Sequence, residues 1–120
     1  MSWELQSDRP IYSQLVERLE ILIFTGTYPP GSRLLSVREL AQEAAVNPNT
    51  MQKALSQLEE AGLLVTHRTS GRSVTEEIDV INEAKDKLAK NQVLSFMENM
   101  KKLGYNKQSI SILINQIQEE

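Results

Sequence analysis

The chain has no cysteine, one histidine, one tryptophan and only 5% aromatic residues. Without cysteine it forms no disulfide and has no thiol nucleophile, and this composition fits a cytoplasmic protein. One histidine and no cysteine leave almost no ligands for zinc. The sequence also lacks a run of about 18 apolar residues, so we expect no membrane-spanning helix. It shows no basic and then apolar N-terminal pattern, so we expect no signal peptide.

The residues that remain give little support to an enzyme. General acid–base and nucleophilic catalysis need a base that is held by a partner group, and His67 is the only histidine. No glycine-rich phosphate loop is present. Glu76, Glu77 and Asp79 could bind a hard cation weakly, but an acidic helix N-terminus explains them without a metal. We therefore predict no catalytic residue, no metal site and no cofactor.

Charge is distributed unevenly along the chain. The net charge is −3, yet residues 33–75 carry five basic and four acidic groups, whereas residues 1–32 and residues 76–120 are each net −2. The one positive segment would give a modest phosphate-driven affinity for nucleic acid. Taken alone, an excess of one charge is equally compatible with chance.

Residues 36–61 have the pattern of two helices separated by a tight break. Ser36 followed three residues later by Glu39 is a capping box, so a helix should start there. An apolar stripe at helical spacing follows, formed by Val37, Leu40, Ala41 and Ala44.

The second helix of this pair begins with two favourable residues. Asn47 is a good N-cap, and Pro48 suits the first helical position because its missing N–H would be unpaired there. Gly62 should end the helix. Its predicted buried side comprises Met51, Ala54, Leu55, Leu58 and Ala61. Its predicted exposed side comprises Asn49, Thr50, Gln52, Lys53 and Ser56. We interpret the pair as a helix-turn-helix whose second helix enters the DNA major groove.

The flanking segments complete a winged-helix pattern. Residues 1–9 should form an extended arm, with Trp3 packing back onto the domain, and Pro10 should open a broadly apolar first helix. Residues 33–35 suit a short strand that pairs with a later hairpin. Residues 63–65 and 72–75 suit the two hairpin strands.

The tip of that hairpin would form the wing. Arg68, Gly71 and Arg72 would contact backbone phosphate or reach a minor groove. An ordinary solvent-exposed hairpin with incidental charges is the alternative for the same residues.

The last segment, residues 76–120, has the pattern of two helices that are too few for a domain of their own. One should run over residues 79–103 and stop at Gly104, and the next should start at Asn106. A second copy of the chain could cover their apolar stripes. A ligand pocket is the less favoured alternative. The predicted dimer interface comprises Leu88, Val93, Phe96, Met97, Met100, Ile110, Leu113, Ile114 and Ile117.

Four motifs in this order resemble the GntR family of bacterial transcription regulators. They are PIYSQL at residues 10–15, GTYPPGSRLLSVRELA at 26–41, VNPNTMQKAL at 46–55 and LEEAGLL at 58–64. The VNPNT form and a tail of about forty residues resemble the YtrA-like subfamily. The resemblance implies a winged-helix domain, a homodimer held by the tail helices, a palindromic operator and control of a nearby transporter operon.

The resemblance also implies roles for single residues. Arg38 matches the family's operator-contacting arginine, and Gly71 matches the glycine at the wing tip. Asn47, Pro48, Asn49, Thr50, Gln52 and Lys53 match the start of the recognition helix and its next exposed positions. The chain departs from the family in two places. It has Leu35 where relatives often have proline, and Pro48 where many have arginine, which removes one base-reading side chain.

The sequence therefore predicts an α+β, mostly α fold. A winged helix-turn-helix of three helices and a small β-hairpin would occupy residues 1–75, and a two-helix dimerisation tail residues 76–120. We expect a cytoplasmic repressor that binds a double-stranded operator as a homodimer. The alternative is a winged helix used only for protein contact. The sequence identifies no effector; one would bind between subunits or near residues 76–81. The predicted DNA-binding residues are Ser36, Arg38, Asn47, Pro48, Asn49, Thr50, Gln52, Lys53, Arg68, Gly71 and Arg72.

Overall fold

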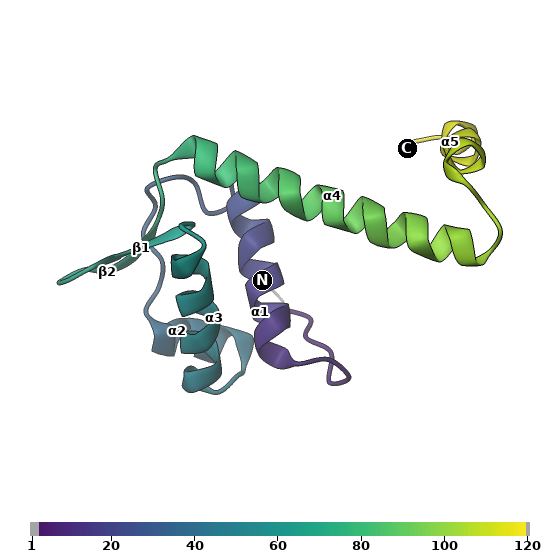
Figure 1. The fold of residues 1–120 in the computed structure, drawn as a ribbon. Helices are drawn as coiled ribbons and strands as arrows, with labels where there is room; N and C mark the ends of the chain where they lie inside the picture. The colour runs from purple at the N-terminus through teal and green to yellow at the C-terminus, as the bar shows by residue number, and fades with distance from the viewer. Residues whose placement is uncertain (1–2, 120) are drawn as a thin grey trace. The chain divides into compact units, whose positions relative to one another are not determined.

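The computed structural model describes residues 3–119, so Met1 and Ser2 of the predicted arm, and Glu120, lie outside the described residues. It confirms the predicted class, a mostly helical winged helix-turn-helix followed by two further helices (Figure 1). In chain order the elements are α1 Ile11–Phe24, α2 Val37–Ala44, α3 Pro48–Glu60, β1 Leu64–His67, β2 Gly71–Val74, α4 Ile78–Lys102 and α5 Lys107–Gln116.

The chain divides into two compact units, Met1–Lys85 and Asp86–Glu120. The start of α4 belongs to the first unit, where Ile81 is buried with the core. The predicted domain boundary between residues 75 and 76 stays a prediction about how the sequence is organised.

The core of the first unit is built on α1. Leu15 and Leu19 are fully buried in it, and Trp3 packs against the same core at 6% exposure, as the sequence predicted. Gln14 ties the N-terminal arm to α1, because its side-chain oxygen accepts from the Gln6 N–H at 2.6 Å and its amide nitrogen donates to the Gln6 carbonyl at 2.6 Å. Because both ends of the buried amide are hydrogen-bonded, its burial leaves no polar group of this side chain unpaired.

The helix-turn-helix starts and stops where its capping residues indicate. The Ser36 hydroxyl accepts from the Glu39 N–H at 3.1 Å, and the Glu39 carboxylate accepts from the Ser36 N–H at 3.1 Å. This capping box confirms the predicted start of α2. α2 ends at Ala44, and its C-cap residue Ala45 has a φ of 58°, which places it in the left-handed region. Asn47 then caps α3, since its side-chain oxygen accepts from the Asn49 N–H at 2.8 Å.

The hairpin after α3 has the antiparallel register Leu64↔Val74, Val65↔Ser73, Thr66↔Arg72 and His67↔Gly71. The expected strand over residues 33–35 is shorter than predicted and reduces to one bridge, Arg33↔Ser73. The backbone N–H of Leu34 still donates to the Arg72 carbonyl at 2.9 Å. The turn closed by the Ser32 N–H on the Pro29 carbonyl and the cap at Ser36 leave only residues 33–35 between them, which limits the length of the pairing.

An ion pair fastens the wing to the recognition helix. The Arg72 guanidinium on β2 donates to the Glu59 carboxylate in the last turn of α3, with side-chain exposures of 16% and 29%. A hydrogen bond from Thr66 and then the Arg72 guanidinium favour the charged form of Glu59. Against the opposing effect of burial, they lower the pKa of this carboxyl group.

The second unit contains most of α4 and all of α5. Gly104, with φ +94°, makes the turn between the two helices. Asn106 caps α5 with its side-chain oxygen, which accepts from the Ser109 N–H at 2.9 Å. Among the described residues, no helix combines the length and the apolar character needed to cross a membrane.

We predict that Glu59→Gln destabilises the first unit by about 1 kcal/mol at pH 7, because it replaces a paired carboxylate by a neutral amide. The folded pKa of Glu59 lies below its unfolded value, so its contribution is complete above the unfolded pKa and is lost as pH falls through the folded pKa. Urea unfolding at pH 7 and below about pH 4 should therefore show the difference shrinking at acid pH. Glu60→Gln, at the exposed neighbouring position, is the control. Equal effects of the two substitutions would contradict this role.

Candidate nucleic-acid interface

The predicted interface residues come from α2, α3 and the hairpin, all within the first unit. The hairpin extends beyond the helices as a separate projection, which is the arrangement of a wing (Figure 1). α3 is anchored from behind by Met51, Ala54, Leu55 and Leu58, none more than 1% exposed. Its opposite side is therefore held outward by the packing of the core.

The outward side of α3 is polar. Asn49, Gln52 and Lys53 are exposed, and Thr50 is half-buried. The Gln52 amide nitrogen donates to the Ser56 hydroxyl at 3.2 Å, one turn along the same helix. This leaves amide, hydroxyl and ammonium groups facing solvent, which are the groups that read base edges and hold phosphates. No large apolar side chain lies among them, so this side does not have the composition of a protein-docking surface.

Three of the predicted residues set the start of a helix. The Ser36 hydroxyl and the Asn47 side-chain oxygen are already engaged as helix caps. Pro48 is exposed and occupies the first position of α3. These residues orient the helices, and direct contact with DNA from any of them stays a prediction. Arg38, by contrast, is exposed in the first turn of α2.

A cleft of about 520 Å³ separates the start of α2 from the wing. Arg33 lies in its wall and is exposed, although sequence reasoning did not include it. The signal was present, because Arg33 is a basic residue in the segment that was expected to pair with the hairpin. The cleft is lined by Arg33, Leu34, Leu35, Ser36, Val37, Thr69, Ser70, Gly71 and Arg72.

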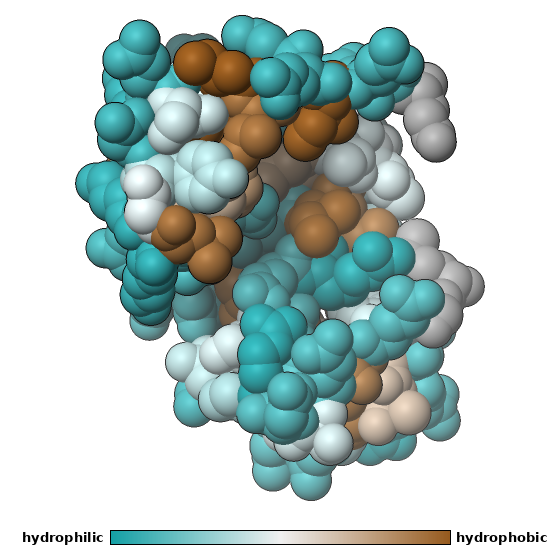
Figure 2. Space-filling model, turned by 90° about the vertical axis from the view of Figure 1, so that its right-hand side faces the viewer, coloured by the Kyte–Doolittle hydropathy of each residue, from teal (hydrophilic) through white to brown (hydrophobic). Residues whose placement is uncertain are grey.

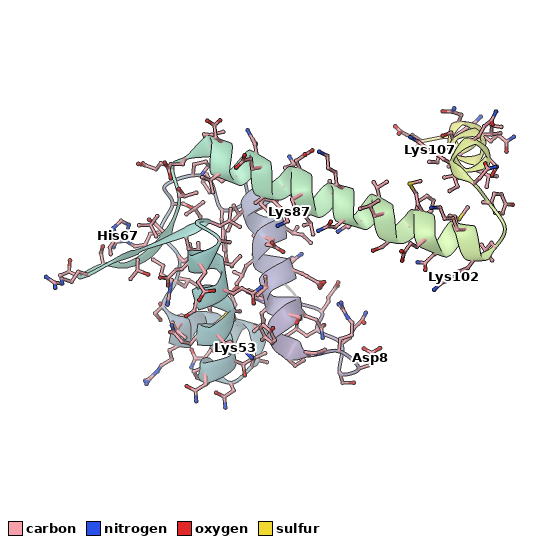
Figure 3. All side chains as sticks on the ribbon, viewed as in Figure 1. Asp8, Lys53, His67, Lys87, Lys102 and Lys107 are labelled. Carbon is pink, nitrogen blue, oxygen red and sulfur yellow. The ribbon has the colours of Figure 1, made fainter. Side chains whose placement is uncertain are left out.

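The wing residues fall into two groups. Arg68 and Gly71 are exposed at the tip. Gly71 has φ +84° with nothing within 4 Å of the position of an added Cβ, so backbone can approach a ligand closely there. Arg72 is half-buried in its pair with Glu59, so it serves first as an anchor for the hairpin. His67 lies on the hairpin (Figure 3), and its Nε2 is 2.7 Å from the Ser73 hydroxyl.

A second cleft, of about 440 Å³, lies between the N-terminal turn of α1 and the first turns of α3. Its lining residues are Ile11, Tyr12, Asn49, Thr50 and Lys53. The Lys53 ammonium is 4.0 Å from the centroid of the Tyr12 ring. Sequence reasoning missed the contribution of α1, because nothing local relates Tyr12 to α3.

The part of the chain that the structure describes contains no group of side chains suited to bind a metal ion. Within residues 3–119, no three His, Cys, Asp or Glu side chains are grouped as metal ligands.

Known regulators resemble this chain in sequence. The family described as "Bacterial regulatory proteins, gntR family" matches residues 11–74. An uncharacterised HTH-type transcriptional regulator of Bacillus subtilis, YhcF, is 36% identical over 92% of this chain and 91% of its own length. The HTH-type transcriptional repressor YtrA of the same organism is 36% identical over 82% of this chain and 71% of its own length.

Solved structures agree with the sequence comparison. A GntR family transcriptional regulator from Listeria monocytogenes superposes with a TM-score of 0.89 at 38% identity, covering 95% of this chain and 100% of its own. The DNA-binding domain of AraR in complex with its operator ORX1 superposes with a TM-score of 0.54 at 29% identity, covering 60% of this chain and 88% of its own. The resemblance seen in the sequence is confirmed, and the chain belongs to the GntR family, as a YtrA-like DNA-binding transcription regulator.

Proposed function

We propose that this regulator is a cytoplasmic repressor that binds a palindromic operator as a homodimer and acts by occupying it. The observation that carries the proposal is the exposed polar side of α3, held outward by a fully buried apolar side. Arg38 and the wing tip are exposed in the same unit. YtrA, which resembles this chain over most of its length, is named as a repressor.

The side chains divide into those that would discriminate bases and those that would bind phosphate. Asn49 and Gln52 are amides, whose donor and acceptor pair matches the edge of adenine in the major groove. Arg38 would make a bidentate contact with guanine or hold a phosphate, and Arg68 would hold phosphate at the wing. Gly71 would let the wing backbone approach a minor groove. These roles are proposals for residues that the structure leaves exposed.

The second unit supports the homodimer. Val93 and Ile114 are each 54% exposed and Phe96 is 44% exposed, although all three are large and apolar. The hydropathy-coloured surface shows brown apolar groups emerging among hydrophilic ones (Figure 2). Exposed apolar surface of this kind marks an interaction site, and a second copy would bury it isologously. Further large apolar residues exposed in this unit are Leu94, Leu103, Ile112 and Ile117.

The predicted interface residues are not equally available for that contact. Leu88, Met97, Met100 and Leu113 are half-buried, and Ile110 is only 4% exposed. Ile110 is therefore covered by other residues of its own chain. It supports the exposed apolar surface from beneath and adds little area to it. We propose the whole predicted set as the dimer interface.

The class of target follows from family resemblance alone. We keep a transporter operon as the class of target. A small-molecule effector, where one acts, would bind between subunits or near residues 76–81, because a two-helix segment encloses little of the roughly 300–1,000 Å³ that such ligands typically need.

Selection from random duplex DNA tests the function as a whole. The full chain, incubated with a randomised library, should enrich an inverted repeat with half-sites about one turn, roughly 34 Å, apart. Electrophoretic mobility of the enriched duplex should show two chains on each site. The absence of any enriched sequence would overturn the proposal of an operator-binding repressor.

We predict that Arg38→Ala and Gln52→Ala each weaken binding to the selected operator, by about 1–3 kcal/mol where the native side chain bonds a base in bidentate fashion. Fluorescence titration of labelled operator measures the change. Gln57→Ala is the matched control, because it removes the same amide from an exposed position nearer the C-terminal end of α3. Our contact assignment is wrong if both variants bind like the unmodified chain.

We predict that Ile114→Glu weakens the dimer at least tenfold, about 1.4 kcal/mol or more, because it places a charge in an apolar contact. Sedimentation velocity over a concentration series measures the dissociation, and operator affinity should fall with it. Asn115→Glu adds the same side chain at the next exposed position of α5 as a control. An Ile114→Glu chain that stays dimeric would place the contact elsewhere.

A further inference from the structure

Lys53 is a predicted DNA-binding residue of α3 whose side chain contacts α1. It projects from the side of α3 that faces α1 (Figure 3), with its ammonium 4.0 Å from the centroid of the Tyr12 ring. Lys53 is exposed, whereas Tyr12 is half-buried and packs against the hydrophobic core. The ring is therefore fixed by packing, and the flexible side chain rests on it.

This contact restricts a side chain that otherwise has many rotamers. A lysine has a flexible four-carbon stem and loses side-chain entropy when it is ordered. Attraction to the face of an aromatic ring compensates for part of that loss, and does so without neutralising the charge. Among residues 3–119, no carboxylate forms a salt bridge with Lys53. The ammonium is thus positioned and still free to attract an anion.

The surroundings indicate which anion. The cleft of about 440 Å³ beside the ring brings together the ammonium of Lys53, the hydroxyl of Thr50 and the amide of Asn49. The Thr50 hydroxyl and the Asn49 amide can donate or accept hydrogen bonds, whereas the Lys53 ammonium only donates, and all three lie at the α1 edge of the recognition helix. The ammonium therefore needs an acceptor, which a backbone phosphate presents on each of its exposed oxygens. The edge of guanine also presents two acceptors, so the test below compares the operator with a scrambled duplex.

We propose that Tyr12 is a positioning residue of the DNA interface, whose ring holds the Lys53 ammonium against a backbone phosphate and away from the base edges. This rests on the proposed function, since it assigns roles within the same operator complex. Lys53 then supplies affinity that does not depend on sequence. Asn49 and Gln52 are left to discriminate bases.

A salt series on two duplexes tests the assignment of Lys53. The probes are the selected operator and a scrambled duplex of the same length. Lys53→Met should weaken binding to both by the same factor, and it should reduce the slope of log K against log salt by about 0.9 for each phosphate that Lys53 neutralises. Lys87→Met removes one positive charge from α4 and measures the general effect of net charge. A weakening confined to the operator would assign Lys53 to a base and overturn the proposal.

A double-mutant cycle tests Tyr12. Tyr12→Leu should weaken binding to both duplexes about two- to fivefold, the size of an exposed cation–π contact, and should have no further effect in the Lys53→Met background. Tyr12→Phe keeps the ring and should bind like the unmodified chain. Weaker binding by Tyr12→Phe, or a Tyr12→Leu effect that persists without Lys53, would overturn the positioning role.

Urea unfolding and the selection experiment distinguish a folding defect from failure of either proposal. Urea unfolding shows whether Tyr12→Leu is folded, and Tyr12→Met replaces it in the cycle if it is not. Failure of the positioning role leaves operator binding by the unmodified chain intact, whereas failure of the proposed function appears earlier, as a selection that enriches no sequence.

Discussion

The structure depends on the burial of one side of α3. Met51 and Ala54 are fully buried, and Leu55 and Leu58 nearly so, which fixes the helix both along its axis and in rotation about it. Because a helix has about 3.6 residues per turn, fixing one side also fixes the direction of the other. Asn49, Gln52 and Lys53 therefore face outward as a consequence of core packing. A change in the core would re-aim the polar side chains without touching any of them.

The start of each helix is the second constraint, because a reading surface must begin at a defined residue. Ser36 and Asn47 supply that definition through hydrogen bonds to the backbone N–H groups of Glu39 and Asn49. The same two residues are among those predicted to bind DNA. A match to a sequence motif does not distinguish a residue that contacts a ligand from one that only fixes where the contacting helix begins. The structure shows the second role directly for both.

Much of the fold could be predicted from local signals in the sequence. The capping box at Ser36, the proline at position 48 and the glycines at 62 and 104 each act within a few residues, so pattern and spacing were enough. The pair of Arg72 with Glu59 and the contact of Lys53 with Tyr12 could not be predicted, because each joins residues that only tertiary packing brings together. The strand expected over residues 33–35 is shorter than predicted, with one bridge at Arg33, for a related reason. A turn on one side and a helix cap on the other limit its length, and the β-propensity of residues 33–35 reflects neither limit.

The ion pair also bears on how a chain of net charge −3 can bind DNA. Within residues 33–75, Glu59 is paired with Arg72, and the Glu39 carboxylate accepts a backbone N–H in its capping box. Arg33, Arg38 and Arg68 remain exposed on the same unit. Counterion release grows with the number of phosphates contacted, so a domain with this few cations holds DNA weakly. Joining two such domains, as in the proposed homodimer, would double the contacts on a single site and so offset this weakness, with the exposed apolar residues of the second unit as the proposed contact.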